Sequence, residues 1–354
     1  MASDRYRVVQ WATGNIGLRS LRAVIDHPQL ELVGLYVYSD AKVGRDAGEL
    51  CGADPTGVVA TRDIEEILAL EPDCVLYMAS EAEIDVLCRL LESGANVVTT
   101  RMEFHRPDSV NPEIRDRIDA ACQRGGSSLH STGISPGFIS EALPLVLLSI
   151  QRRLDRLTID EFADMSSRNS PEMIFDLLGF GREPGPFNAG LSAHAASSFG
   201  PSLRLVADAI GVPIDSVESS GEQAVARNRV EIAAGVIEAG TVAAQRMTVS
   251  CMSGGQQLLR FRANWYMTTD LDPAWDLRET GWRVLVEGDT PLDISIRFPV
   301  SEEEYPAMSP GLTAHRPVNA IPYVVAAEPG IRSVLDLPQV VAHLDGSHHA
   351  VDPA

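Results

Sequence analysis

A short apolar segment, a glycine-rich turn and an amphipathic helix open the chain in the stretch VVQWATGNIGLRSL. Gly14 and Gly17 have the spacing of the last two glycines of G-x-G-x-x-G, and Ala12 stands in the first place. Such a turn binds the pyrophosphate of a dinucleotide at the free N–H groups of the helix; a tight turn without a ligand is the alternative. Ala12 in place of the first glycine is expected to cost little free energy, because this place needs only a small residue. The predicted contacts are Ala12, Thr13, Gly14, Asn15, Ile16 and Gly17.

Strand-like and helix-like segments alternate along the first part of the chain. This alternation predicts βαβ units and a parallel, Rossmann-like sheet. Because the carboxyl ends of parallel strands share one edge, ligands are expected to bind there. The strand-like segments are 7–12, 30–38, 74–78, 96–100 and 128–131, and the helix-like segments are 15–26, 63–70, 81–93 and 112–124.

The pattern changes after the stretch SPG at residues 135–137. Residues 166–214 are rich in Gly, Pro and Ser and show only short helical pieces, and helical patterns return at 318–327 and 336–343. Segments of alternating hydrophobicity at hairpin spacing predict a largely antiparallel sheet. These segments are 156–165, 217–226, 229–238, 241–252, 257–267, 282–287 and 292–298.

The predicted fold class is therefore α/β: an N-terminal Rossmann-like parallel sheet and a second α+β domain with a largely antiparallel sheet. We expect a dinucleotide-binding domain at 1–135, a substrate and dimerisation domain at 136–310, and a helical segment at 311–354 that returns to the first domain. The long alternating strands predict an apolar sheet face that pairs two copies into a homodimer.

Charge and composition exclude several classes of function. The formal net charge of −20 argues against nucleic acid and anionic membranes as general partners. Lys42 is the only lysine, so a lysine Schiff base elsewhere is excluded. No H-E-x-x-H or C-x-x-C pattern occurs, and no metal site is predicted. Scattered cysteines, the lack of an apolar leader and short apolar stretches predict a cytoplasmic protein that does not span a membrane.

The loop after the second strand-like segment, VYSDAKVGRDAGEL, bears on the choice between NAD and NADP. An acidic residue there binds the ribose diol of NAD, whereas a cation accommodates the 2′-phosphate of NADP. Ser39 takes the tip of the loop, and Lys42 and Arg45 follow within reach, so NADP is favoured and NAD stays open. A solvated loop with incidental charges is the alternative. Further predicted cofactor contacts are Ala79 and Thr100, at the ends of later strands.

Glu103 is the candidate proton-transfer residue, in the stretch NVVTTRMEFHRP. It follows a strand directly, so it is expected on the ligand-binding edge, among Met102, Phe104 and Pro107. A carboxylate in apolar surroundings holds its proton more tightly and acts as a base near neutral pH. A solvated surface glutamate is the alternative. His105 and Arg106 are the neighbouring candidates.

A second turn, in LHSTGISPGFISEALP, joins the nucleotide-binding domain to the next helix. Gly133 and the Pro136-Gly137 pair give it a fixed course. Its N–H groups, with Ser135 or Phe138, are expected to face a nicotinamide ring, and a hinge without such a contact is the alternative.

The order of these motifs resembles the NAD(P)-dependent amine dehydrogenases related to 2,4-diaminopentanoate dehydrogenase, which are distant relatives of dihydrodipicolinate reductase. The motifs are ATGNIG, YSDAKVGRDAGEL, a glutamate after a strand, TGISPGF, and RPVNAIP followed by PGI, and the resemblance spans about residues 5–340. It implies reversible reductive amination of small or medium ketones and aldehydes with ammonia, with Glu103 as the catalytic residue. Glu103 would accept a proton and stabilise a cationic C=N bond.

The resemblance also implies substrate contacts from Ser135, Phe138, Phe162, Asn169 and Thr313. Ser135 stands where many relatives have a larger residue. Asn319 is either a cofactor contact or a helix-packing residue. Two other functions stay open: a carbonyl or C=C reductase of the same fold that does not use ammonia, and a non-catalytic NADP-binding sensor.

Overall fold

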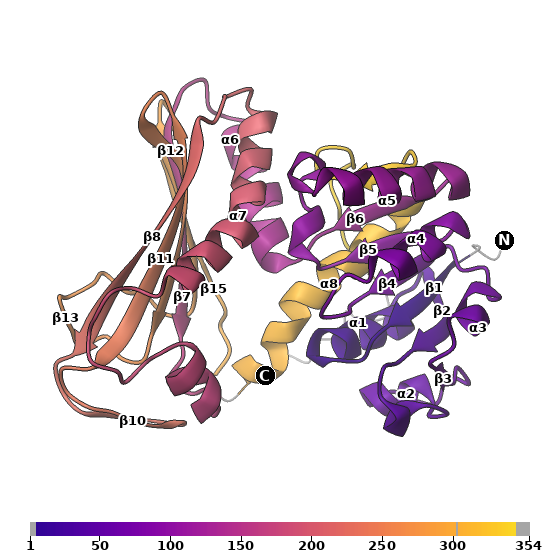
Figure 1. Ribbon diagram of the computed structural model, residues 1–354, viewed down its shortest axis with the longest axis horizontal. Helices are drawn as coiled ribbons and strands as arrows, with labels where there is room; N and C mark the ends of the chain where they lie inside the picture. Colours follow the sequence, from indigo (N-terminus) through magenta and orange to yellow (C-terminus); the bar gives the residue numbers. More distant parts are fainter. Residues whose placement is uncertain (1–4, 302–303, 345–354) are drawn as a thin grey trace, which may run out of the picture. The chain divides into compact units, whose positions relative to one another are not determined.

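The computed structural model describes residues 5–301 and 304–344. These residues form two compact units, which Figure 1 colours along the sequence. The first unit holds the described residues up to Phe138 and again from Pro306 onward, and the second holds Ile139–Tyr305. Within the described ranges, no helix combines the length and the apolar character that crossing a membrane requires.

A seven-stranded sheet forms the centre of the first unit, in the order β16-β6-β5-β4-β1-β2-β3. Every neighbouring pair in it is parallel, which confirms the predicted Rossmann-like sheet. The carboxyl ends of its strands therefore share one edge, and the loops that carry the candidate residues leave from that edge. The strands are β1 Tyr6–Trp11, β2 Leu30–Tyr36, β3 Ala60–Thr61, β4 Cys74–Tyr77, β5 Asn96–Thr99, β6 Ser128–Ser131 and β16 Gly330–Arg332.

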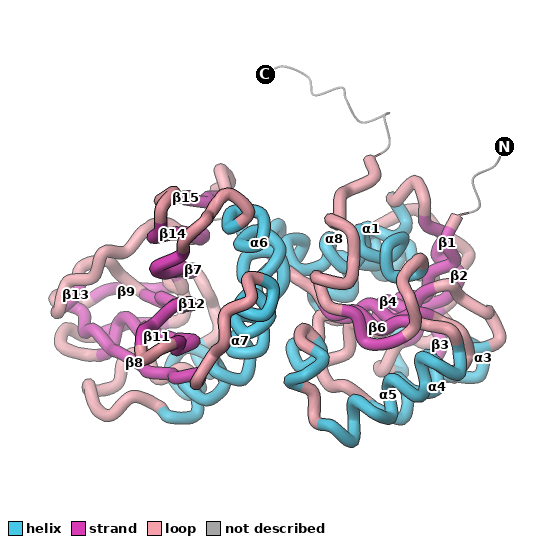
Figure 2. Tube along the Cα trace, turned by 90° about the horizontal axis from the view of Figure 1, so that it is seen from above, coloured by secondary structure: helices cyan, strands magenta, loops and turns pink. Residues whose placement is uncertain are grey.

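Helices cover both faces of this sheet, as Figure 2 shows from above. Alternate residues of each strand enter different cores: Val9 packs in the core with Leu90 and Ile118, whereas Val8 packs in the core with Val24 and Ile321. Near-continuous apolar strands are needed for this arrangement, and RVVQW and CVLY supply them. The helices are α1 Asn15–Asp26, α2 Ala47–Cys51, α3 Ile64–Leu68, α4 Ile84–Glu92, α5 Pro112–Gly125 and α8 Tyr305–Val325.

The second unit is built on another seven-stranded sheet, in the order β13-β8-β11-β12-β7-β14-β15. The β12–β7 pair is parallel and the other pairs are antiparallel, so the prediction of a largely antiparallel sheet is confirmed. The strands are β7 Leu154–Asp164, β8 Ser216–Ala226, β11 Val242–Ser253, β12 Gln256–Tyr266, β13 Leu271–Asp272, β14 Gly281–Gly288 and β15 Leu292–Arg297.

One long helix, α7 Ala189–Ala209, packs on one face of this second sheet. Phe199 of the helix stacks on Phe261 of β12, with ring centroids 3.8 Å apart. The sequence predicted only short helical pieces here, which is wrong. The interior Pro201 and the Ser and Gly residues hid the helix, which is stabilised by burial against the sheet.

Three other elements differ from the sequence-based expectation. The segment 229–238 is not one strand but a tight pair, β9 Val230–Ile232 and β10 Gly235–Ile237, that forms a separate two-stranded sheet. The helix expected at 336–343 is absent there, because Pro338 interrupts it and Asp336 instead accepts bonds from Ser333. Helix α8 begins well before residue 318 and contains four prolines, which read as breaks in the sequence: Pro306 in its first turn and Pro310, Pro317 and Pro322 further along.

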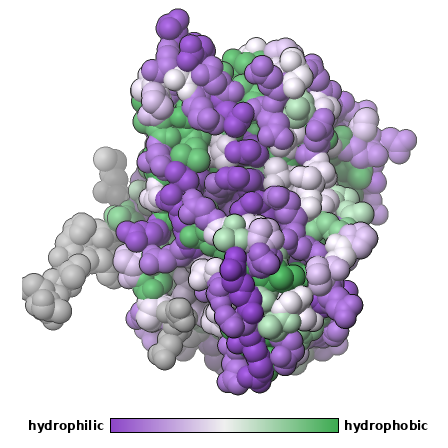
Figure 3. Space-filling model, turned by 90° about the vertical axis from the view of Figure 1, so that its left-hand side faces the viewer, coloured by the Kyte–Doolittle hydropathy of each residue, from purple (hydrophilic) through white to green (hydrophobic). Residues whose placement is uncertain are grey.

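The second sheet's other face carries charged side chains. Arg262 donates hydrogen bonds to both carboxylate oxygens of Asp160, and Arg283 pairs likewise with Asp293. Figure 3 looks at this side of the molecule and shows hydrophilic residues across its middle, with smaller hydrophobic patches beside them. The apolar face expected here for dimerisation is therefore wrong for the middle of the sheet, because the apolar alternate residues face α7. The homodimer itself stays a prediction.

We expect the stability of the first unit to fall in mild acid through His27, the residue that ends α1. Burial lowers the pKa of His27 below its usual 6.5, and nearby His343 adds to the effect. Below pH 6.5 the unfolded chain therefore takes up this proton more readily than the folded one, so the free energy of unfolding decreases as pH falls. Urea unfolding at pH 7.5 and 5.5 measures the loss, which should be smaller in His27→Gln. An equal loss in the two proteins would contradict this account.

Candidate functional site

The glycine-rich turn leaves the amino end of α1 open to a ligand. Gly14 is the residue before the helix, it provides no side-chain cap, and the first turn of α1 contains no acidic residue. By contrast, Asn111 caps α5 with its side chain. The uncapped N–H groups and the positive end of the helix dipole therefore suit an anion such as a pyrophosphate.

Gly17 and Gln10 fix the shape of this turn. A Cβ atom on Gly17 would lie 2.3 Å from the carbonyl oxygen of Ala12, so the helix approaches the strand more closely than any other residue permits. The buried Gln10 side chain donates to the same oxygen at 2.9 Å and accepts a bond from Ser20 at 2.8 Å. The sequence analysis did not single out Gln10, although a glutamine inside an apolar strand is a signal of such a role.

Ala12 corrects one expectation about the turn. Its φ is +72°, in the left-handed region that glycine enters without steric cost. An alanine there costs about 1 kcal/mol. The expectation that any small residue is tolerated cheaply is therefore wrong, because the backbone conformation and not only the space matters at this position.

Lys42 reaches the turn from the loop after β2. Its Nζ donates to the carbonyl oxygen of Thr13 at 2.9 Å and to the Thr13 hydroxyl at 3.0 Å. Ser39 lies exposed at the start of the same loop. Arg45 instead pairs with Glu49 four residues later, at 2.7 Å. The loop therefore brings Lys42 to the turn, while Arg45 is engaged elsewhere.

The other predicted cofactor contacts lie in two different places. Ala79 and Thr100 follow β4 and β5 directly, on the ligand-binding edge of the sheet. Asn319 on α8 lies near the other end of α1, where it lines a hollow with Ala23 and His27. The structure therefore does not bring Asn319 to the glycine-rich turn.

Glu103 lies on the short turn Met102–Phe104 that follows β5, and the buried Phe104 anchors this turn. The Nε and Nη2 atoms of Arg101 donate to Glu103 Oε1 at 3.0 and 2.9 Å. The Glu103 side chain is 39% exposed. The apolar surroundings predicted for it are therefore wrong: a cation two residues earlier on the same loop pairs with the carboxylate. His105, the neighbouring candidate, is buried close to Gly137.

The segment that follows β6 lies against α8 within the first unit. Arg316 of α8 donates to the Thr132 hydroxyl at 3.0 Å, and its guanidinium lies 5.6 Å from the centre of the Phe138 ring. A Cβ on Gly133 would meet the methyl group of Thr313 at 3.4 Å. The structure thus places Thr313 of α8 beside the segment that contains Phe138. The sequence analysis missed Arg316, the α8 residue that contacts this segment.

Ser135 in this segment is unusual because its hydroxyl oxygen is buried without a hydrogen-bond partner among the described residues. A buried hydroxyl normally has a partner, so an unpaired one marks a position where a bound molecule or a water supplies the bond. This observation is consistent with the predicted contact to a ligand.

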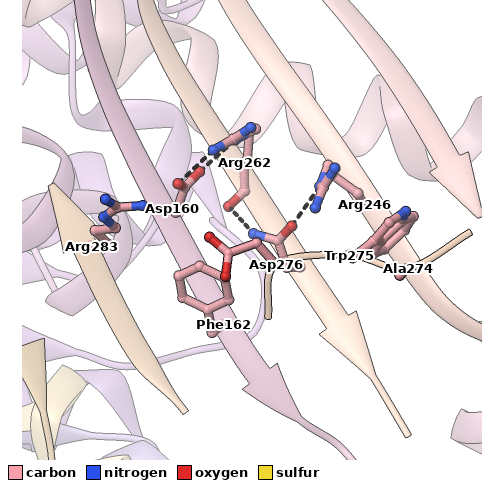
Figure 4. A pocket seen from close by; sticks show the side chains of 9 residues that line it. Asp160, Phe162, Arg246, Arg262, Ala274, Trp275, Asp276 and Arg283 are labelled. Carbon is pink, nitrogen blue, oxygen red and sulfur yellow. Dashed lines mark hydrogen bonds and ion pairs between the residues drawn. The ribbon is translucent and has the colours of Figure 1, made fainter. Parts of the chain in front are cut away.

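Phe162 and Asn169, the two remaining predicted substrate residues, belong to the second unit. Phe162 lies on β7 and lines a hollow of about 280 Å³ on the charged face of the sheet. Figure 4 shows the labelled residues that line this hollow. The Arg246 guanidinium lies 4.3 Å from the centre of the Trp275 ring, and its Nε donates a hydrogen bond to Asn264 at 2.6 Å. Asn169 is exposed on the loop after β7 and does not line the hollow.

A metal centre finds no support in the part of the chain that the structure describes. Nowhere in residues 5–301 and 304–344 do three or more His, Cys, Asp or Glu side chains form a group that could hold a metal ion. The histidines at 348 and 349 lie outside the described residues.

Comparison with known proteins places the chain among the amine dehydrogenases. The family of the 2,4-diaminopentanoate dehydrogenase C-terminal domain matches residues 138–352. An amine dehydrogenase from Streptomyces virginiae is 33% identical over 345 residues, which cover 93% of this chain and 95% of the relative. The chain belongs to the amine dehydrogenase and 2,4-diaminopentanoate dehydrogenase family. The family predicted from the order of motifs is thus confirmed.

Two further members of the amine dehydrogenase family extend this result. A 2,4-diaminopentanoate dehydrogenase from Acetoanaerobium sticklandii is 23% identical and covers 95% of this chain and 94% of its own length. The solved structure of an amine dehydrogenase from Mycobacterium smegmatis has a TM-score of 0.73 at 22% identity, and covers 96% of this chain and 97% of its own. The chain is therefore an oxidoreductase of this family with an NAD(P)-binding dehydrogenase fold.

Proposed function

We propose that this enzyme catalyses the reductive amination of small or medium ketones and aldehydes with ammonia, and the reverse deamination of the amine, with NADP as cofactor. The single observation that carries the proposal is the position of Glu103, on the loop after β5 at the same sheet edge as the glycine-rich turn after β1. Only β4 separates these two strands. The activity named for the Streptomyces virginiae relative supports the reaction class.

The glycine-rich turn fits a pyrophosphate, because α1 is uncapped and no atom lies within 4 Å of the place that a Cβ on Gly14 would take. The bound cofactor would supply the hydride. Glu103 would accept a proton from ammonium, and the ammonia so formed would add to the carbonyl carbon to give a carbinolamine. Glu103 would then return this proton to the carbinolamine hydroxyl, which leaves as water. The restored carboxylate would stabilise the iminium cation of the substrate until the hydride reaches it.

Lys42 favours NADP over NAD in this proposal. The loop after β2 carries no acidic residue at its tip, where an enzyme specific for NAD binds the ribose diol; Ser39 stands there instead. Lys42 lies beside it and is held at the turn by Thr13. Asp40, the nearest carboxylate along the chain, is paired with Arg62. A 2′-phosphate would therefore meet a serine hydroxyl and an ammonium group.

Replacing Lys42 with alanine should weaken NADPH binding about 10- to 100-fold, because a hydrogen bond to a charged group contributes about 1.5–3 kcal/mol. NADH lacks the 2′-phosphate, so its Kd should change much less. Fluorescence titration with both cofactors measures the two effects, and Arg89→Ala serves as the control, because Arg89 on α4 pairs with Glu65 on α3. Equal weakening of NADPH and NADH would show that Lys42 only shapes the turn through Thr13.

The substrate is proposed to contact Ser135, Phe138 and Thr313 of the first unit. The contacts expected from Phe162 and Asn169, which belong to the second unit, stay predictions. The unpaired Ser135 hydroxyl supports the first group. A homodimer is proposed as the working assembly.

The dependence of cofactor oxidation on ammonium tests the proposed function. With pentanal or cyclohexanone as substrate, NADPH oxidation should require ammonium. Equal rates with and without ammonium would instead identify a carbonyl reductase. Tight NADPH binding without oxidation across a broad panel of carbonyl compounds would identify a sensor.

A further inference from the structure

Arg101 contacts three segments at the ligand-binding edge of the first sheet: the loop after β4, its own loop after β5, and the end of β6. Its Nη1 donates to the carbonyl oxygen of Ser80, in the loop after β4, and its Nε and Nη2 donate to Glu103 Oε1. Its own carbonyl oxygen accepts a bond from the hydroxyl of Ser131, the last residue of β6, at 2.6 Å. Its N–H donates to the Thr99 hydroxyl at 3.2 Å. The Ser131 and Thr99 bonds therefore fix the backbone of Arg101, and the guanidinium is held between the Ser80 carbonyl and Glu103.

This arrangement restrains a side chain that has few other anchors. Glu103 stands on a single short turn and is 39% exposed, whereas the Arg101 side chain is 26% exposed. Both bonds from Arg101 end on Oε1, and Oε2 takes part in neither. The pair thus fixes the carboxylate while one of its oxygens remains outside the Arg101 contact. Such an oxygen is suited to a substrate nitrogen.

We propose that Arg101 is a positioning residue of this enzyme: its two bonds to Glu103 Oε1 hold the carboxylate so that Oε2 is aimed at the substrate nitrogen. The inference rests on the proposed role of Glu103. It predicts that the paired bonds of the guanidinium, and not its charge alone, are needed for full turnover. Lysine at this position would keep the charge, and glutamine would keep a donor without the charge.

The test compares Arg101→Gln and Arg101→Lys with the wild type. The mobility of the Glu103 side chain is measured by ¹³C NMR relaxation on protein with labelled glutamate side chains, and the Glu103→Gln spectrum identifies its signal. In Arg101→Gln the Glu103 side chain should become more mobile, and in Arg101→Lys it should do so to a smaller extent. The kcat with ammonium and pentanal should fall about tenfold or more in Arg101→Gln, and Arg101→Lys should recover part of it. The Kd for NADPH should stay at the wild-type value in both variants.

Arg117→Ala is the matched control, because Arg117 pairs with Asp85 on the surface of the same unit. It should leave the mobility of Glu103 and the kcat unchanged. An unchanged mobility of Glu103 in Arg101→Gln overturns the proposal, and so does a loss of activity that follows only a loss of NADPH binding. If the wild type shows no ammonium-dependent turnover, the proposed function fails, while the NMR relaxation still decides whether Arg101 positions Glu103.

Discussion

Replacing Glu103 with glutamine is expected to reduce kcat by about 100- to 10,000-fold, the usual contribution of a positioned acid–base group. Glutamine has nearly the same shape and still accepts a bond from Arg101, but it neither takes up the proton nor stabilises the iminium cation. The Kd for NADPH should stay close to the wild type, because the glycine-rich turn and Lys42 are unchanged. Steady-state rates with ammonium and pentanal, with a separate NADPH titration, measure the two quantities.

Glu92→Gln provides a matched control for this experiment. Glu92 is 41% exposed and pairs with Arg124, so it resembles Glu103 in exposure and partner but lies at the end of α4. Its replacement should leave kcat unchanged. Turnover near the wild-type level in Glu103→Gln would remove Glu103 from the mechanism, and equal losses in both variants would indicate a general effect of lost ion pairs.

Alanine at either glycine of the turn should weaken NADPH binding, but only the variant at Gly17 should also lose stability. In Gly17→Ala the new Cβ would lie 2.3 Å from a backbone oxygen of Ala12, so strand and helix must separate. Forced shifts of packed backbone cost about 1–3 kcal/mol or more, and we expect NADPH binding to be lost with them. In Gly14→Ala the Cβ would have no atom within 4 Å, and φ is −71°, so the fold should be unaffected.

Gly14→Ala is therefore the informative variant for the cofactor. Its stability to urea should match that of the wild type, while its Kd for NADPH should rise about tenfold or more, because a methyl group would stand where the backbone meets the pyrophosphate. Urea unfolding and fluorescence titration measure the two effects. An unchanged Kd would mean that the turn only connects β1 to α1 and binds no dinucleotide.

The first unit was largely predictable because its signals are local. Helix α1 begins at Asn15 and ends at Asp26, as its apolar spacing and glycine turn indicated, and β6 has the predicted bounds 128–131. Strand β16 was missed because Gly330–Arg332 is only three residues long and is defined by its pairing with β6, about 200 residues earlier along the chain. Helix α7 was missed for a related reason, since packing and not its own composition stabilises it.

The sequence predicted those site residues whose role depends on a single loop, but not the contacts that form only when the chain folds. The loop sequence alone indicated that Lys42 lies near the turn. The charged partner of Glu103 was missed, although Arg101 stands two residues before it, because the contact depends on how the loop folds after β5. The role of Arg316 was also missed: its contact with Thr132 joins residues 184 positions apart, and no local pattern reports such a pair.

Reductive amination with ¹⁵N-labelled ammonium tests the central claim most directly. The purified enzyme is incubated with NADPH, pentanal or cyclohexanone, and ¹⁵N-ammonium, and the products are identified by mass spectrometry. We predict a primary amine that carries ¹⁵N, formed in a one-to-one ratio to the NADPH consumed. An alcohol without ¹⁵N, formed at the same consumption of NADPH, would contradict the account.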